Sequence, residues 1–209
     1  MTCRLSQIVD RPTLLLAAFD FPVNADAIDG WRPRHNIAPG GQALVVHGDP
    51  SDARATKMRW AQGMGRLRPW ARDDTFMKGR YKSAKRCVIP VPGFYEWPSG
   101  TKKAYFVQPT DRKILAFAGI YVEHDDGGTF AVLTTEHNAD IKPLYHRMAI
   151  YLEPAECKLW LNPETPRPRL HALMKQWPEG RLKHYQVSTR VHSHHADDKA
   201  RVAPLEKNK

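Results

Sequence analysis

A single carboxylate among aromatic side chains is the first feature of this sequence that suggests chemistry. Glu96 lies between Tyr95 and Trp97, near the end of the stretch R-C-V-I-P-V-P-G-F-Y-E-W that begins at Arg86. A carboxylate in such surroundings is partly desolvated, which favours its protonated form and suits it to carry a proton. The alternative is a glutamate on the solvated face of a strand, paired with one of the many lysines or arginines.

The N-terminus offers further reactive groups. The chain begins Met1-Thr2-Cys3-Arg4, and an initiator methionine is normally removed when a small residue such as threonine follows. Removal would expose an α-amine on Thr2, and α-amines are partly neutral and nucleophilic near neutral pH. The thiol of Cys3 is a second candidate nucleophile. The other interpretation is a frayed terminus without a function.

Two segments have the composition of a nucleic-acid contact. Residues 32–41, R-P-R-H-N-I-A-P-G-G, form a basic loop suited to backbone contacts with phosphates. Residues 58–72 interleave Trp60 and Trp70 with four arginines, and exposed rings beside arginines bind single strands. A core strand at Trp60 followed by a solvated basic loop explains this segment equally well.

The overall charge favours an anionic partner. The chain of 209 residues has 32 Lys and Arg against 22 Asp and Glu, a formal net charge of +10. Its three cysteines, Cys3, Cys87 and Cys157, are odd in number and lack the spacing of metal ligands. We therefore expect free thiols in a reducing compartment.

Metal, cofactor and membrane anchor are not expected. His192, His194 and His195 lie close together without an acidic or cysteine partner at ligand spacing, so no metal site and no cofactor are assigned. No apolar stretch has the length of a membrane helix, and the N-terminus lacks the apolar core of a signal peptide. A protein free in the cytoplasm is expected.

The elements that must position these residues are mostly strands. Short apolar runs bounded by turn signals predict strands at 43–46, 87–89, 94–97, 104–107, 114–122, 130–134, 149–152 and 186–191. Hairpin turns at 99–102 and 125–128 join them as a β meander, and Gly119 would allow a close backbone approach or a bulge. Short helices are predicted at 13–19 and 154–161.

Motifs along nearly the whole chain resemble those of the SRAP family (SOS response-associated peptidase). They are R-H-N-I-A-P-G from Arg34, M-R-W from Met58, P-W-A-R-D from Pro69, the stretch from Arg86 to Trp97, F-A-G-I-Y from Phe117, L-T-T-E-H-N from Leu133, R-M from Arg147 and V-S-T-R-V from Val187. The resemblance implies an α+β fold, with a curved, barrel-like, mostly antiparallel β-sheet flanked by helices. We expect one such domain over residues 1–209, monomeric, with a polar tail from about residue 196.

The resemblance also implies a function in the SOS response to DNA damage. Family members recognise abasic sites in single-stranded DNA and trap the ring-opened aldehyde as a thiazolidine on an N-terminal cysteine, assisted by Glu, Asn and His. Glu96 falls on the family's glutamate, which implies a proton carrier. Where the family begins Met-Cys-Gly-Arg, this chain has Thr2 at the nucleophile's position, Cys3 one place later, and Arg4 as a matching phosphate contact.

Two further motifs depart from the family pattern. The Asn-Ala-Arg motif has no clear counterpart here, and the His-x-Arg motif reads Tyr145-His146-Arg147. The implied catalytic residues are Thr2, Cys3, Glu96, Tyr145 and His146. The implied DNA contacts are Arg4, Asn36, Pro39, Trp60, Trp70, Arg72 and Arg147, in a protein associated with the nucleoid.

Three functions are compatible with these departures. The first is covalent recognition of abasic or damaged single-stranded DNA. An imine on Thr2 would either close to a labile oxazolidine or lead to lyase-type cleavage of the strand. Alternatively, the thiol of Cys3 would trap the aldehyde as a hemithioacetal. The second is binding of single-stranded DNA without catalysis. The third is a hydrolase or peptidase that uses Cys3, His146 and Glu96, although the family's proteolysis is chiefly self-processing of the initiator methionine.

Overall fold

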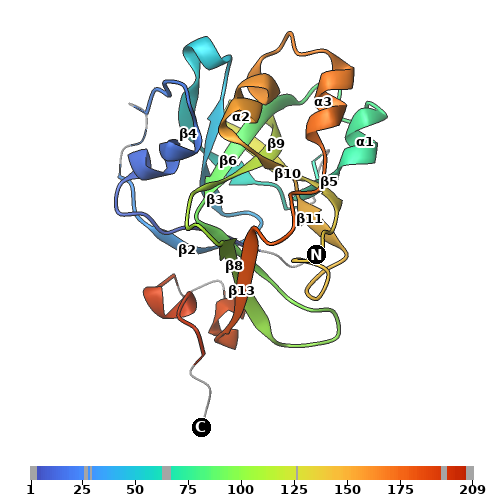
Figure 1. Cartoon of the computed structure of the whole chain (residues 1–209). Coiled ribbons are helices and arrows are strands. Elements are labelled where there is room, and N and C mark those ends of the chain that lie inside the picture. The colour runs from blue at the N-terminus through green and yellow to red at the C-terminus, as the bar shows by residue number, and fades with distance from the viewer. Residues whose placement is uncertain are drawn as a thin grey trace.

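Two β-sheets form the framework of this protein (Figure 1). The computed structural model describes residues 4–25, 28, 30–62, 67–125, 127–193 and 197–205. The helices are α1 (Asp73–Met77), α2 (Pro154–Leu161) and α3 (Arg167–Leu173), with 3-10 helices η1 (Pro12–Ala18), η2 (Pro50–Asp52), η3 (Thr189–His192) and η4 (Lys199–Arg201).

The larger sheet closes into a barrel. Its strands are, in order around the barrel, β4 (Arg54–Trp60), β3 (Gln42–His47), β6 (Lys85–Val91), β9 (Leu115–His124) and β10 (Gly127–Glu136). β10 pairs with β9 on one side and with β4 on the other, which closes the ring. The β4–β10 pairing is parallel, and the other barrel neighbours are antiparallel. Short strands extend this sheet: β5 (Trp70–Arg72) and β11 (Arg147–Ala149) beside β10, and β12 (Tyr151–Leu152) beside β9.

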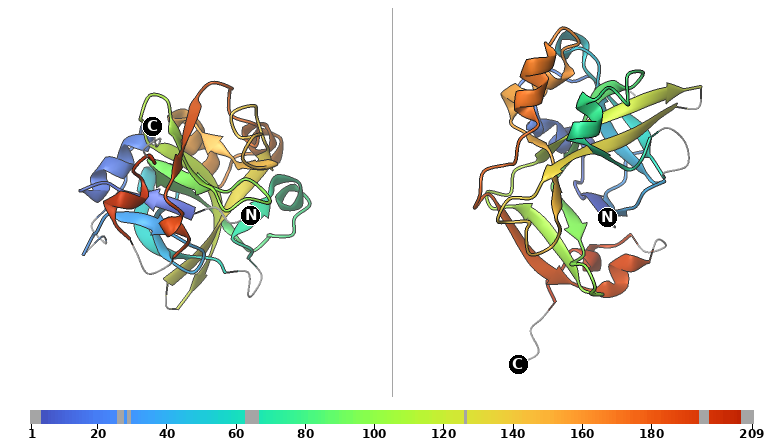
Figure 2. Two further views of the ribbon diagram at one scale, coloured as in Figure 1. Left: turned by 90° about the horizontal axis from the view of Figure 1, so that it is seen from below. Right: turned by 90° about the vertical axis from the view of Figure 1, so that its right-hand side faces the viewer.

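The second sheet is antiparallel and lies at the end of the barrel opposite α2 and α3 (Figures 1 and 2). Its order is β13 (Leu182–Val187), β8 (Ala104–Pro109), β7 (Gly93–Glu96), β1 (Arg4–Gln7) and β2 (Arg34–Ile37). The buried side chain of Gln7 ties it to the barrel, because Nε2 donates to the carbonyls of Leu44 and Pro90, both at 2.9 Å.

Close backbone packing explains why glycine occurs at two strand positions. A Cβ at Gly119 would lie 2.4 Å from Cδ1 of Ile89, and a Cβ at Gly93 would lie 2.3 Å from Cζ of Phe106. Both distances are far below a van der Waals contact. The same Cβ at Gly119 would lie 3.0 Å from the backbone carbonyl oxygen of Ala131, so the close backbone approach expected there is confirmed.

Helix α2 is held against the barrel by hydrogen bonds of one arginine and one tryptophan. Arg86 donates to the carbonyls of Trp160 and Asn162, each at 2.6 Å, and Nε1 of Trp160 donates to the carbonyl of Cys87 at 3.0 Å. The helix starts with Pro154 in its first turn, and Glu153 and Glu156 complete a capping box. These contacts fix the helix on the outer face of β6.

The predicted fold class is confirmed, and so are the strands of the meander and the helix at 154–161. Three local predictions differ. Residues 34–37 form β2 rather than loop, because they pair with β1. The helix expected at 13–19 is the 3-10 helix η1, and the last strand ends at Val187, where Ser188 caps η3 by accepting from the amide of Arg190. No helix in the described ranges is long and apolar enough to cross a membrane.

Candidate functional site

Glu96 is the last residue of β7, in the second sheet. The residue is 2% exposed, and it pairs with Tyr105 of the neighbouring strand β8. On the other side, Arg4 of β1 lies opposite Tyr95. Since Arg4 is the first described residue, β1 brings the N-terminal end of the described chain next to Glu96. The alternative of a glutamate on the solvated face of a strand is wrong.

Tyr145 interacts electrostatically with Glu96. Its pKa is raised, first by partial burial and then by the negative charge of Glu96, while the positive charge of Arg147 lowers it. These effects place the three side chains within electrostatic reach of one another. At neutral pH the phenol stays protonated, so it can donate a hydrogen bond or a proton. His146 is exposed, and its ring centroid lies 4.2 Å from that of Tyr145.

Arg147 is fixed in place by neighbouring strands. Nε donates to Oγ1 of Thr134 at 3.1 Å, and Nη2 donates to the carbonyl of Thr134 at 2.5 Å and to Oδ1 of Asp73 at 2.8 Å. The guanidinium is 11% exposed. Asp73, the first residue of α1, was not singled out from the sequence, because its partner is 74 positions away. The ion pair holds a positive charge beside Tyr145.

The candidate nucleophiles at the N-terminus, Thr2 and Cys3, lie outside the described residues. The other two thiols are unsuited to chemistry. Cys87 and Cys157 are both free and buried, and burial raises the pKa of each thiol well above its usual value. A thiol held protonated in an apolar interior is a poor nucleophile. His194 and His195 also lie outside the described residues. The described part of the chain contains no group of three or more His, Cys, Asp or Glu side chains that could hold a metal ion.

Arg4 and Asn36 are buried beneath the C-terminal part of the chain. Arg4 donates to Oδ1 of Asn36 at 3.0 Å and to the carbonyl of His192 at 2.7 Å. The side-chain amide of Asn36 donates to the carbonyls of Val191 at 3.2 Å and Ser193 at 3.0 Å. Burial, and next the positive charge of Arg201, lower the pKa of Arg4. In this arrangement both predicted DNA contacts bind protein.

Trp60 does not form a DNA contact, which corrects the prediction. Its side chain is fully buried in the barrel, stacked on Phe130 at 6.1 Å between ring centroids, and Nε1 donates to the carbonyl of Pro69 at 2.9 Å. A ring without exposed surface cannot stack on a base. The core interpretation of this residue is the right one, because β4 turns its side chain into the closed barrel.

Three other predicted contacts keep exposed surface. Trp70 is partly exposed and packs edge-on against Trp60 at 4.9 Å. Arg72 is 57% exposed and forms two hydrogen bonds to the carboxylate of Asp74, at 3.0 and 3.1 Å. Pro39 is partly exposed in the turn between β2 and β3. Because β5 and β11 both border β10, Trp70 and Arg72 lie on the same side of the barrel as Arg147.

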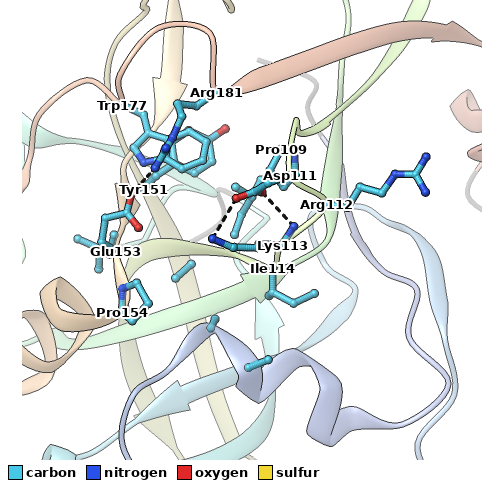
Figure 3. A pocket seen from close by; sticks show the side chains of 15 residues that line it. Pro109, Asp111, Arg112, Lys113, Ile114, Tyr151, Glu153, Pro154, Trp177 and Arg181 are labelled. Atoms are coloured by element: carbon cyan, nitrogen blue, oxygen red, sulfur yellow. Dashed lines mark hydrogen bonds and ion pairs between the residues drawn. The ribbon is translucent and has the colours of Figure 1, made fainter.

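A separate cavity of about 330 Å³ is lined by none of the predicted site residues (Figure 3). Tyr151 and Trp177 stack there with centroids 4.9 Å apart, and the guanidinium of Arg181 lies 5.5 Å from the Trp177 ring. Its charges are largely paired: Arg181 contacts Glu153 at 3.2 Å, and Lys113 contacts Asp111 at 3.3 Å. Sequence reasoning gave no sign of this cavity, because its residues come from five segments of the chain.

Comparisons with known proteins agree with the fold and identify a family. Residues 1–194 match the family described as SOS response associated peptidase (SRAP). The chain is 30% identical over 210 residues to abasic site processing protein YoaM of Bacillus subtilis, covering 86% of this chain and 91% of that protein. It is 25% identical over 232 residues to abasic site processing protein HMCES of Gallus gallus, covering 84% of this chain and 67% of that protein. A crystal structure of a Bacteroides thetaiotaomicron protein superposes with a TM-score of 0.74 at 19% identity, covering 98% of this chain and 99% of that one, which supports the fold alone.

Proposed function

This chain belongs to the SOS response associated peptidase family, and from that premise we propose that it recognises abasic sites in single-stranded DNA in the DNA damage response. The observation that carries the proposal is the placement of Glu96. A buried carboxylate lies at the end of β7, close to a protonated phenol and a fixed guanidinium, beside the strand that leads back to the N-terminus. Two of the relatives are named abasic site processing proteins.

The proposed chemistry is attack of the N-terminal amine on the ring-opened sugar. After removal of Met1, the α-amine of Thr2 adds to the aldehyde carbon, a proton moves from nitrogen to oxygen, and water leaves as the imine forms. Glu96 moves the proton, and the hydroxyl of Tyr145 stabilises the oxygen that leaves as water. The positive charge of Arg147 lowers the pKa of the Tyr145 phenol and so opposes the effect of Glu96 on that group.

The fate of the imine depends on the side chain that closes onto it. The hydroxyl of Thr2 gives an oxazolidine, which reopens more readily than the thiazolidine of an N-terminal cysteine. Loss of a proton from the imine-bound sugar then leads to β-elimination and cleavage of the strand. The Cys3 thiol offers the other route, a hemithioacetal formed by addition of sulfur to the aldehyde.

DNA would lie along the barrel face that carries β5 and β11. Arg72 is exposed for a phosphate, and Trp70 presents part of its ring for a base. We expect the protein to act as a monomer in the cytoplasm, at the nucleoid.

The test is a denaturing gel of purified protein with a single-stranded oligonucleotide that carries one abasic site, with and without borohydride. Borohydride reduces an imine to a stable amine, so a crosslink that requires borohydride is expected for wild type and for Cys3→Ala. A crosslink that forms without borohydride and disappears in Cys3→Ala, but not in the matched Cys157→Ala, would move the nucleophile to the thiol. No crosslink and no preference for the abasic strand would contradict the proposal.

A second candidate is binding of single-stranded DNA without covalent chemistry. The observation that favours it is the chain's departure from the family at two catalytic positions, with Thr2 in place of the cysteine and Tyr145 in place of the histidine. Binding that falls steeply with salt, with equal affinity for intact and abasic strands and no crosslink, would identify this function. The hydrolase alternative is confined to Cys3, since the other two thiols are buried.

A further inference from the structure

An acidic side chain from the C-terminal segment occupies a site built for an anion. We call residues 188–193 and 197–205 the C-terminal segment. Oδ2 of Asp197 lies 2.6 Å from Nε of Arg34, and Oδ1 accepts hydrogen bonds from the backbone amides of His35 and of Asn36, the latter at 3.0 Å. One carboxylate thus contacts a guanidinium and two consecutive backbone N–H groups.

A bulge in β2 creates this arrangement. In the pairing of β1 with β2, Leu5 lies opposite Ile37 and Gln7 opposite Arg34, so β2 has one residue more than β1 between these pairs. Successive amides of a regular strand point in opposite directions, and the extra residue turns two of them to the same side. β2 is also the edge of its sheet, which leaves these amides for a ligand rather than for another strand.

Two further arginines lie near this site: the charges of Arg4, Arg201 and Asp197 all act on Tyr95, whose hydroxyl donates to the carbonyl of His35. The acidic Asp198 acts on His35 from the same segment. Arg201 is 4% exposed, and within the described part of the chain its Nε and Nη1 atoms have no hydrogen-bond partner. Its nearest ion pair is a long one, 3.7 Å to Asp198. Arg4 lies close enough for Arg201 to lower its pKa. Consecutive amides together with guanidinium groups are what phosphate sites in proteins use.

We propose that Asp197 takes the place of a DNA phosphate, so that its carboxylate must leave the site at Arg34, His35 and Asn36 before a single strand can bind there. The inference rests on the proposed function, because it names the ligand of this site as the backbone of single-stranded DNA. Arg34 and Asp197 are 37% and 30% exposed, so the carboxylate and the turn that follows it, residues 197–200, can move away from β2 while the rest of the chain stays folded. The rest of the segment stays attached through the bridge from Val187 to Pro204 and the hydrogen bond from Tyr185 to the carbonyl of Val202, at 2.8 Å.

The first experiment measures binding of a fluorescent single-stranded oligonucleotide without any lesion, by anisotropy at low salt. Asp197→Asn removes the negative charge that competes with phosphate and keeps an oxygen that can accept from the amides. The control, Asp198→Asn, changes the net charge by the same amount but leaves the Asp197 carboxylate in the site. Asp197→Asn is expected to bind about fivefold more tightly than wild type, the size of one partly exposed ion pair, with Asp198→Asn close to wild type. Equal gains in both variants, no gain in Asp197→Asn, or no binding by any of the proteins overturns the inference.

The second experiment needs no variant and decides the question if Asp197→Asn does not fold. Hydrogen exchange of the wild-type protein is followed by mass spectrometry in the peptide spanning Asp197 to Leu205, with and without the oligonucleotide. Displacement of Asp197 is expected to speed exchange at the amide of Ala200, which is now bonded to Asp198 at 3.0 Å. Unchanged or slower exchange in this peptide contradicts the inference.

The two proposals fail in different ways. A fivefold gain in Asp197→Asn that is the same for intact and abasic strands, with no crosslink, keeps the phosphate site and rejects abasic-site chemistry. A crosslink in wild type with no gain in Asp197→Asn keeps the chemistry and rejects the role of Asp197.

Discussion

At the scale of single residues, burial separates the groups that can react from those that cannot. Glu96 is almost fully enclosed, and its negative charge raises the pKa of Tyr145 while the positive charge of Arg147 lowers it. Cys87 and Cys157 are enclosed by apolar side chains and stay protonated. Burial thus accompanies the proposed proton carrier at one position and unreactive thiols at two others. Which result follows depends on the polar neighbours.

Substitution of Glu96 by glutamine should remove proton transfer and retain binding. We expect Glu96→Gln to slow formation of the borohydride-trapped crosslink about a hundredfold, because general acid–base catalysis contributes at least this much. The affinity for an intact strand should stay within about twofold of wild type. The matched control is Glu164→Gln, an exposed glutamate between α2 and α3. A crosslinking rate that Glu96→Gln leaves unchanged would remove Glu96 from the mechanism.

Thiol labelling should tell the cysteines apart. Because Cys87 and Cys157 are buried and protonated, we expect neither to react with Ellman's reagent at pH 8 in the folded protein, while all thiols react in guanidinium chloride. Any thiol labelled under native conditions is then Cys3, and the Cys3→Ala variant should show no native labelling. Native labelling that persists in Cys3→Ala would show that the barrel opens.

At the scale of elements, local signals predict some segments and not others. The helix at 154–161 follows from a proline at its start and an acidic first turn, both of which are local. β2 was missed because its four residues include two basic ones and become a strand through pairing with β1, about 30 positions earlier. Trp60 was ambiguous because its burial depends on closure of the barrel. The contacts of Asp197 could not be predicted from the sequence, because its partners are 161 to 163 positions away along the chain.

Crowding across strands β6 and β9 predicts a specific compensation. Gly119→Ala should destabilise the protein by about 1 to 3 kcal/mol, because its Cβ would overlap Cδ1 of Ile89. Ile89→Val removes that carbon and alone costs about 1 kcal/mol. Urea denaturation of both single variants and the double variant should therefore give a double-variant loss smaller than the sum. A strictly additive loss would mean that the strain lies elsewhere, at the carbonyl of Ala131.

At the scale of the whole molecule, the site lies where two sheets meet. Glu96 comes from the second sheet, whereas Tyr145 and Arg147 come from segments attached to the barrel. Gln7 and the chain between β6 and β7 join the two sheets, so their relative position sets the distance between the reacting groups. Stability of the junction is then a condition for activity.

Two histidines make that stability depend on pH. Burial lowers the pKa of His35 and of His47 below the ordinary value of 6.5, against the opposing effect of nearby carboxylates. The unfolded chain therefore binds more protons just below pH 6.5, so stability is full above this pH and falls as the pH drops. We expect the midpoint of thermal unfolding to fall between pH 7 and pH 5.5.

His47 should account for part of this loss. His47→Gln keeps a polar side chain near Oγ1 of Thr56, which lies 3.1 Å from Nε2, and should make the decline with pH shallower. The exposed His171 serves as the control, and His171→Gln should leave the decline unchanged. An identical pH profile for His47→Gln and wild type would assign the decline to other groups.

The parallel seam between β4 and β10 has a consequence for how the chain folds. These strands are separated by more than 60 positions, and the hairpins β3–β4 and β9–β10 can form on their own before the seam exists. Closing so long a loop costs chain entropy, so the seam forms late and sets the folding rate. We expect the same seam to open early on unfolding and so to expose Trp60, which is fully buried beside Phe130 in the closed barrel.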